Sequence, residues 1–278
     1  GGSGHEPTHA GFVGEGMLSA AVCGQVFTSP TPDQIYAAIK AVNQGKGVFM
    51  VVKNYTGDVM NFDMAKDLAS MDNIPVKSIV VDDDIAVENS LYTQGRRGVA
   101  GTIFMHKILG AAAEQGASLD EIDALAKKVL PNIKTIAVAL SAATNPEVGK
   151  PGFILKEDEI EYGVGTHSEP GYRREKIKPS KELVDELIGK LNDEMHLDSS
   201  KKYACLINGM GATPLMEQYI FSNDVLNKLE TFGIEPSFMK VGNYMTSIDM
   251  AGISLTLFEI QDDKWLDYLN YPVKTIAW

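Results

Sequence analysis

Glycines and proton-carrying side chains occur together at the start of the chain, in Gly1-Gly2-Ser3-Gly4-His5-Glu6-Pro7-Thr8-His9. Consecutive glycines let the backbone approach a ligand closely and present N–H groups to its oxygens. An exposed imidazole beside such donors can exchange protons near neutral pH. Because a glycine loop alone is often only a tight turn, His5 is the residue that makes this segment a candidate site.

A lysine and a carboxylate lie close together in a second segment, Lys53-Asn54-Tyr55-Thr56-Gly57-Asp58. Lys53 ends the apolar run from Val48 to Val52, which is typical of a buried central strand. After a turn, Asp58 would bring an opposite charge to the same crevice. The alternative is structural, with Asp58 as the N-cap of a helix that begins at Val59.

A third segment, Tyr162-Gly163-Val164-Gly165-Thr166-His167-Ser168-Glu169-Pro170-Gly171, has the same form as the first: glycines, a histidine, then Glu-Pro. It too could be a structural loop. Ligand crevices of open α/β sheets lie beyond the carboxyl ends of the strands. Two such loops on distant parts of the chain, each carrying a histidine, therefore suggest a shared cleft.

Other candidate residues have simpler explanations. His106 falls within an apolar helix and His196 at the end of another, so both are expected to be structural. Asp82-Asp83-Asp84 could bind Mg²⁺, but a solvated strand end explains it better. The chain has no P-loop of the form Gx4GK[ST], and Gly209-Met210-Gly211 falls short of a dinucleotide fingerprint. We therefore expect no cofactor, no metal and no nucleotide site on this chain.

The composition narrows the possible partners and the compartment. Lys plus Arg total 25 and Asp plus Glu total 37, a formal net charge of −12, which argues against a nucleic-acid or membrane surface. No apolar run reaches the roughly 20 residues of a membrane span, and no signal segment is present, so we expect a cytoplasmic protein. Cys23 and Cys205 are far apart in apolar surroundings and are interpreted as buried free thiols.

Apolar periodicity predicts alternating strands and helices, the pattern of an α/β fold. Helices are predicted at Asp33–Asn43, Val59–Met71, Arg97–Gln115, from Ser118 to before Pro131, at Lys181–Met195, after Pro214 and at the C-terminus. Strands are predicted at Val48–Val52, Val76–Val81, Ile133–Leu140, Ile160–Tyr162, Ala204–Ile207, Ser237–Val241 and Ile253–Glu259. Ser118 starts a capping box. We predict two α/β domains, residues 1–131 and 132–278, with mixed sheets flanked by helices and the site between them.

The chain begins without a methionine, directly in a glycine loop. Because such loops normally follow a strand, we expect an N-terminal segment that precedes Gly1 and is not part of this sequence.

The three segments and their spacing resemble the dihydroxyacetone kinase K subunits, and the likeness extends from Gly1 to Trp278. The residues that carry it are Gly1 to Leu18, Lys53 to Phe62 and Gly163 to Gly171. Members normally have several tens of residues before the first loop, which this sequence lacks. The resemblance implies that His167 attacks the ketone carbon to form a hemiaminal. It also implies that the sugar hydroxyls are held by Gly2, Ser3, Gly4, His5, Lys53 and Asp58.

Further expectations follow from this resemblance. His5 and Asp58 would be the proton-transfer groups, and Phe27 and Ser29 would line the same pocket. Some members carry a nucleotide-binding domain after this one. Because the sequence ends at Trp278, we expect the split, phosphotransferase-dependent type. In that type a separate L subunit holds ADP with Mg, and an M subunit rephosphorylates the bound ADP. A homodimer is also implied.

Two other functions stay open. A K-like coactivator would sense dihydroxyacetone and act on transcription through a partner; it would need the sugar-binding histidine but not the acid–base pair. Since His5 and Asp58 are both present, we favour the kinase. A lipid-binding protein of similar α/β build is a third possibility, against which the reactive histidine loops argue.

Overall fold

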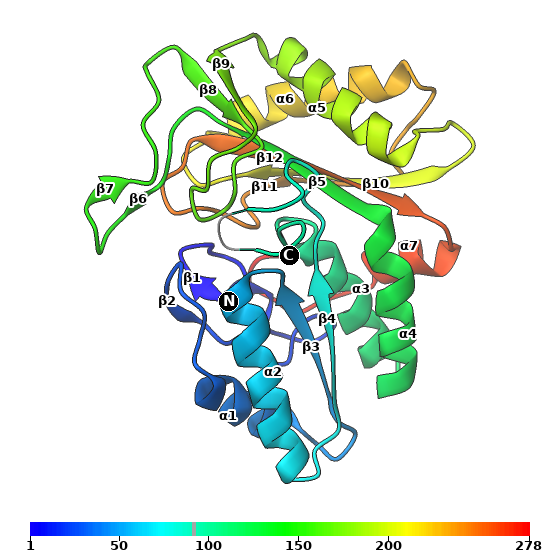
Figure 1. Cartoon of the computed structure of the whole chain (residues 1–278). Helices are drawn as coiled ribbons and strands as arrows, with labels where there is room; N and C mark the ends of the chain where they lie inside the picture. Colours follow the sequence, from blue (N-terminus) through cyan, green and yellow to red (C-terminus); the bar gives the residue numbers. More distant parts are fainter. Residues whose placement is uncertain (91–92) are drawn as a thin grey trace.

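The computed structural model describes residues 1–90 and 93–278 and has an α/β fold built on one six-stranded mixed sheet (Figure 1). The order of the strands is β11 (Phe238–Gly242), β10 (Lys202–Gly209), β12 (Gly252–Ile260), β5 (Ile133–Ala139), β8 (Glu159–Tyr162) and β9 (Arg173–Lys176). β10 and β11 are parallel, and the other pairs are antiparallel. The predicted mixed α/β class is confirmed.

Helices cover both faces of this sheet, which explains the continuous apolar runs in its central strands. On one face α5 (Ser180–Met195) and α6 (Leu215–Glu230) pack against Tyr203, Cys205 and Ile207 of β10. On the other face Ala204 and Leu206 of the same strand join the core under α3 (Thr102–Glu114), α4 (Leu119–Val129) and α7 (Asp263–Asn270). The alternation of neighbouring residues between the faces follows from the two-residue period of a strand.

The first part of the chain forms a smaller layer in which β3 (Val48–Lys53) pairs in parallel with β4 (Val76–Val81) beside α1 (Pro32–Val42) and α2 (Thr56–Met71). Among residues 1–90 and 93–278, β3 is bonded to β4 alone. Its other edge lines a groove of about 670 Å³. The prediction of a central strand here was therefore wrong, because the apolar run is covered by helices but has one strand neighbour.

Several short elements complete the chain. They are β1 (Gly2–Ser3), β2 (Gly24–Val26), β6 (Thr144–Asn145), β7 (Lys150–Pro151) and two 3₁₀ turns, Ala10–Phe12 and Leu130–Asn132. In the part of the chain described, no helix is both long and apolar enough to cross a membrane.

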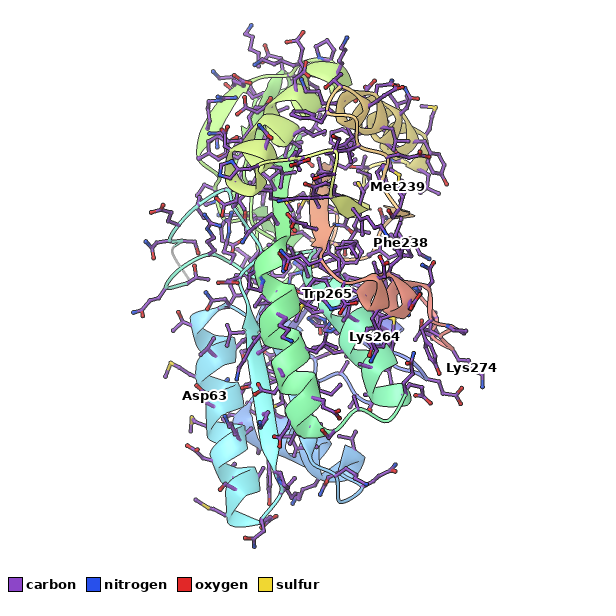
Figure 2. The ribbon with its side chains drawn as sticks, turned by 90° about the vertical axis from the view of Figure 1, so that its right-hand side faces the viewer. Asp63, Phe238, Met239, Lys264, Trp265 and Lys274 are labelled. Carbon is purple, nitrogen blue, oxygen red and sulfur yellow. The ribbon has the colours of Figure 1, made fainter. Side chains whose placement is uncertain are left out.

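The largest core draws on both sides of the predicted domain boundary. The rings of Phe258 on β12 and Trp265 on α7 are stacked with centroids 5.7 Å apart, in the same cluster as α3 and α4. Figure 2 labels Trp265 together with Phe238 on β11. The C-terminal segment returns to the first loop, where Ala277 donates from its backbone N–H to the carbonyl of Gly11. The division at residue 131 stays a prediction.

Two further sequence-based expectations were wrong. The helix predicted from Arg97 begins only at Thr102, because the carboxylate of Asp83 accepts the backbone N–H groups of Val99 and Gly101, each at 2.7 Å. Cys205 is buried as expected, but Cys23 is exposed. By contrast, the capping box at Ser118 is confirmed, with its hydroxyl accepting the N–H of Glu121.

Candidate active site

The two histidine loops meet, as their common form predicted. Nε2 of His5 lies 3.1 Å from Nε2 of His167. His5 is fully buried, and 12% of the His167 side chain is exposed. The first loop is held by the segment after β11, where Thr246 N–H donates to the His5 carbonyl and Ile248 N–H donates to the Gly4 carbonyl.

The outer nitrogens of this pair determine where its protons lie. Nδ1 of His5 is 2.9 Å from the carbonyl oxygen of Thr246, which can only accept, so that nitrogen carries a proton. Nδ1 of His167 is 3.2 Å from Oε1 of Glu169 and donates to this carboxylate. Both Nε2 atoms are then acceptors in neutral rings. A hydrogen bond between them therefore forms only when the pair holds one further proton.

Glu169 orients the His167 loop from two sides. Its Oε2 accepts the backbone N–H of His167 at 2.8 Å, while Oε1 faces the ring of the same residue. Burial raises the pKa of Glu169, but the hydrogen bond and charge of His167, with Arg97, outweigh it and lower the pKa to about 2. The carboxylate stays ionised at neutral pH and can stabilise a positive charge on the His167 ring.

Aromatic rings enclose the histidine pair. Phe27 stacks on His5 at 5.2 Å between centroids and meets His167 edge-on at 5.3 Å. Tyr55 lies edge-on to His167 at 4.3 Å, and its hydroxyl contacts Thr166 at 3.2 Å. Phe27 thus contacts both histidines. Ser29 instead contacts Asn61 of α2.

Lys53 and Asp58 form a second pair of buried groups near the first loop. Lys53 is 3% and Asp58 is 5% exposed. The Lys53 ammonium and Oδ1 of Asp58 are buried with no hydrogen-bond partner in the described structure. Burial lowers the pKa of Lys53, and the negative charges of Asp58 and Glu169 act in the opposite direction. Oδ1 of Asp58 lies 3.8 Å from the terminal ammonium of Gly1. Buried polar atoms without a hydrogen bond can bond a ligand.

The helix-capping alternative for Asp58 was wrong. α2 begins at Thr56 with Tyr55 as its N-cap, so Asp58 lies inside the first turn. An acidic group there is favoured by the helix dipole, but it makes no cap.

The glycines of the first loop are required by packing within the protein, apart from any contact with a ligand. A Cβ on Gly2 would lie 2.6 Å from the backbone nitrogen of Thr28, and one on Gly4 would lie 2.8 Å from the Phe27 ring. The Gly4 N–H already donates to the Glu6 carboxylate, at 3.1 and 3.0 Å to its two oxygens, and the Ser3 hydroxyl donates to the Gly24 carbonyl at 2.7 Å. In this structure these groups are therefore bonded within the protein.

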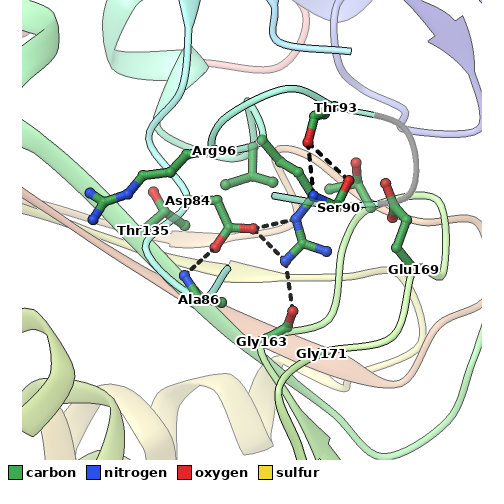
Figure 3. A network of polar contacts seen from close by, with 12 residues as sticks. Asp84, Ala86, Ser90, Thr93, Arg96, Thr135, Gly163, Glu169 and Gly171 are labelled. Atoms are coloured by element: carbon green, nitrogen blue, oxygen red, sulfur yellow. Dashed lines mark hydrogen bonds and ion pairs between the residues drawn. The ribbon is translucent and has the colours of Figure 1, made fainter. Parts of the chain in front are cut away.

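The other candidates lie outside the histidine pair, though not always as predicted. His106 is buried and contacts Nδ1 of His9 at 2.8 Å, and His196 caps the end of α5. The expectation of a solvated strand end at Asp82-Asp83-Asp84 was wrong, because Asp83 and Asp84 are buried and hydrogen-bonded within the protein (Figure 3). Among the residues described, no group of three or more His, Cys, Asp or Glu side chains could hold a metal ion.

Three groups of this cluster were not among the predicted site residues. Glu169 was within reach of sequence reasoning, since it lies two residues after His167 in a loop already singled out. Tyr55 lies between the two predicted residues Lys53 and Asp58, but an aromatic residue next to a strand is usually core. The carbonyl of Thr246 leaves no trace in the sequence, because any residue there provides one.

Replacing Glu169 by glutamine is expected to destabilise the fold mainly above pH 5. A pKa of about 2 in the folded protein, against an ordinary 4.5, means that the carboxylate stabilises the fold above its unfolded value. As the pH falls from there toward 2, the unfolded chain takes up the proton first, and the advantage of the wild type shrinks. Urea unfolding at pH 7, 5 and 3.5 measures this difference, with exposed Glu147→Gln as the control. A difference independent of pH would contradict it.

Comparisons with known proteins identify the family of this chain. The Dak1 domain model matches residues 1–277. The dihydroxyacetone-binding subunit DhaK of a PTS-dependent dihydroxyacetone kinase from Lactococcus lactis is 69% identical over 278 residues, which is 100% of this chain and 84% of that protein. The DhaKLM operon coactivator DhaQ of the same organism is 49% identical over 280 residues, covering 100% of this chain and 85% of that protein.

A solved structure shows the same fold. The dihydroxyacetone kinase from C. freundii, in complex with AMP-PNP and Mg²⁺, matches with a TM-score of 0.92 at 34% identity, and the match covers 100% of this chain and 50% of that one. With a domain model that spans nearly every residue and a relative at 69% identity, the chain belongs to the Dak1 family of dihydroxyacetone kinases.

Proposed function

We propose that this chain is the dihydroxyacetone-binding subunit of a phosphotransferase-system-dependent dihydroxyacetone kinase. The observation that carries the proposal is the pair of histidines 3.1 Å apart, backed by Glu169 on one side and the Thr246 carbonyl on the other. Such a pair can attack a carbonyl carbon and supply the proton that the carbonyl oxygen then needs. Glycerol has no electrophilic carbon, so the same site would separate the ketone from the alcohol.

The covalent step balances with the protons placed above. Nε2 of His167 forms a bond to the ketone carbon while the C=O π electrons move to oxygen. The proton shared by the histidines stays with His5 and passes from its Nε2 to that oxygen, giving a hemiaminal hydroxyl. The alkylated His167 ring keeps its Nδ1 proton and a positive charge, which Glu169 balances. Burial, with the charges of Lys53 and His167, lowers the pKa of His5 well below its ordinary value, so a proton that the pair has taken up is held weakly and passes readily to the alkoxide oxygen.

Phosphoryl transfer would use the second pair of groups. The terminal hydroxyl of the held sugar would attack the phosphorus atom of the donor, the bond from that phosphorus to the donor's leaving-group oxygen would break, and Asp58 would take the hydroxyl proton. Lys53 would bond the sugar oxygens and offset charge. We propose that the phosphoryl group comes from an L-type partner subunit carrying ADP and Mg, which a phosphotransferase M subunit rephosphorylates. The relatives named above as subunits support this division of labour. A homodimer and a cytoplasmic location stay predictions.

The isolated chain is expected to bind dihydroxyacetone but to make no glycerone phosphate from free ATP, because its sequence has no P-loop. A coupled assay of glycerone phosphate, with and without an L-type partner, tests this. Turnover should require the partner. Robust ATP-dependent turnover by the chain alone would refute the split-subunit proposal.

A sugar-sensing coactivator is the second candidate, favoured by the 49% identity to DhaQ. The two functions differ in their need for a base. A sensor would bind dihydroxyacetone with Asp58 present or absent and would give no product with any L-type partner. The same coupled assay therefore separates them, provided that binding is measured in parallel by calorimetry.

A further inference from the structure

Arg97 is a completely buried cation beside the His167 loop, and the function proposed above gives it no role. Its side chain has 0% exposure. Nε and Nη2 both lie 2.7 Å from Oδ2 of Asp84, and Nη2 also donates to the carbonyl of Gly163 at 2.7 Å. Figure 3 labels Asp84, Gly163 and Glu169 in this network. Arg97 thus ties the end of β4 to the start of the histidine loop.

The third nitrogen of the guanidinium faces Glu169. Nη1 is buried without a hydrogen-bond partner in the part of the chain that the structure describes. A Cβ added to Gly165 would collide with both this atom and Oε2 of Glu169, so the two lie on opposite sides of one small space. Only a glycine at residue 165 allows the cation to come so close to the carboxylate that holds His167.

We propose that Arg97 is a positioning residue for His167, acting through Glu169 and through the Gly163 carbonyl. Its two bonds to Asp84 fix the guanidinium plane, and the bond to Gly163 fixes where the loop leaves β8. The remaining N–H edge places a permanent positive charge beside Glu169. The carboxylate is thereby kept ionised and able to accept Nδ1–H of His167, which leaves Nε2 as the nucleophile.

The charge balance explains why a cation is needed there. Glu169 is faced by His167 on its own loop. Arg97 and Asp84 face it from the β4 side. Tyr55 and Lys53 face it from the β3 side. Without Arg97, the buried carboxyls of Asp84 and Glu169 would face each other with no fixed cation between them. One of two such groups takes up a proton. A protonated Glu169 would no longer orient His167.

The test compares Arg97→Gln with Arg96→Gln in the full chain. Arg96 is its sequence neighbour and pairs instead with Glu194 on α5, with 27% of its side chain exposed. Affinities for dihydroxyacetone and glycerol are measured from pH 3 to 8. In Arg97→Gln the preference for the ketone should fall about tenfold or more at pH 7, on the scale of lost orienting contacts. The pH below which this variant loses its preference for the ketone should also rise by about one unit. Glycerol affinity should be unchanged, and Arg96→Gln should match the wild type.

Two further variants keep the outcome decisive. Arg97→Lys restores a charge between the carboxyls and should recover most of the pH profile. Asp84→Asn/Arg97→Gln removes the buried pair as a whole, which is tolerated better than leaving one charge alone. It also removes the carboxyl that opposes Glu169, so its pH profile should stay close to that of the wild type, while the lost bond to the Gly163 carbonyl should still lower the ketone preference. If Arg97→Gln or the double variant folds and keeps the wild-type preference for the ketone, or if both ligands weaken equally, Arg97 has only a structural role.

The inference rests on the proposed function, so one readout is independent of it. Nitrogen NMR of the sugar-free protein reports which ring nitrogen of His167 carries the proton. The Nδ1–H form should dominate in the wild type and in Arg96→Gln, and a mixture of tautomers should appear in Arg97→Gln. If the wild type shows no ketone preference at all, the proposed function fails. Identical His167 tautomers in all variants would instead refute the role of Arg97 alone.

Discussion

Asp58→Asn is expected to leave dihydroxyacetone affinity nearly intact while turnover with an L-type partner falls by roughly 10²-fold or more, the usual scale for loss of a general base. The amide keeps the size and much of the hydrogen bonding of the carboxylate, so the sugar should still bind. It cannot accept the proton of the attacking hydroxyl. Calorimetry and the coupled glycerone phosphate assay, run on the same preparation, separate the two effects.

The matched control for this prediction lies on the same helix. Asp63 is an exposed residue of α2, labelled in Figure 2, and Asp63→Asn removes the same charge from the same element. Its turnover should equal that of the wild type. Helix-dipole effects on stability are about 0.3–1 kcal/mol and cannot account for a hundredfold loss. An Asp58→Asn variant with near wild-type turnover would return Asp58 to a structural role in the first turn of α2.

Much of this fold could be predicted because most of its elements have a strong apolar pattern. The strand at Val76–Val81 matches the prediction residue for residue, and α5 begins one residue before its predicted start. The errors arise where tertiary contacts decide. Nothing local indicates that the Asp83 carboxylate would hold residues 99–101 out of a helix.

The candidate site could be predicted only as far as local motifs reach. Glycines next to a histidine marked both loops, and the structure brings His5 and His167 into contact. The proton position on His167 depends on Glu169. That on His5 depends on the carbonyl of Thr246, which lies 241 residues away in the sequence. Likewise, the buried Asp84–Arg97 pair looks like surface charge in the sequence, because charged residues are rarely buried without such a partner. The packing of the two rings against each other and the tautomer of His5 therefore come from long-range contacts.

His167→Ala is expected to bind dihydroxyacetone and glycerol about equally, because only the covalent bond separates a ketone from an alcohol of the same size. In the wild type, dihydroxyacetone labelled with ¹³C at its ketone carbon should show that carbon's NMR signal move from the carbonyl to the sp³ region on binding. The variant should leave it in the carbonyl region. A crystal soaked with the sugar should likewise show density continuous with Nε2 of His167 in the wild type.

The control for this variant is His196→Asn at the end of α5. His196 is exposed and has φ of 51°, a left-handed conformation that asparagine tolerates, so the change removes an imidazole without strain. It should keep the full preference for the ketone. Some turnover could survive in His167→Ala, since Lys53 and Asp58 still hold the hydroxyls, so lost activity is not the decisive observation. Lost discrimination is decisive: a His167→Ala protein that still strongly prefers the ketone would rule out the covalent mechanism and leave His167 a structural loop residue.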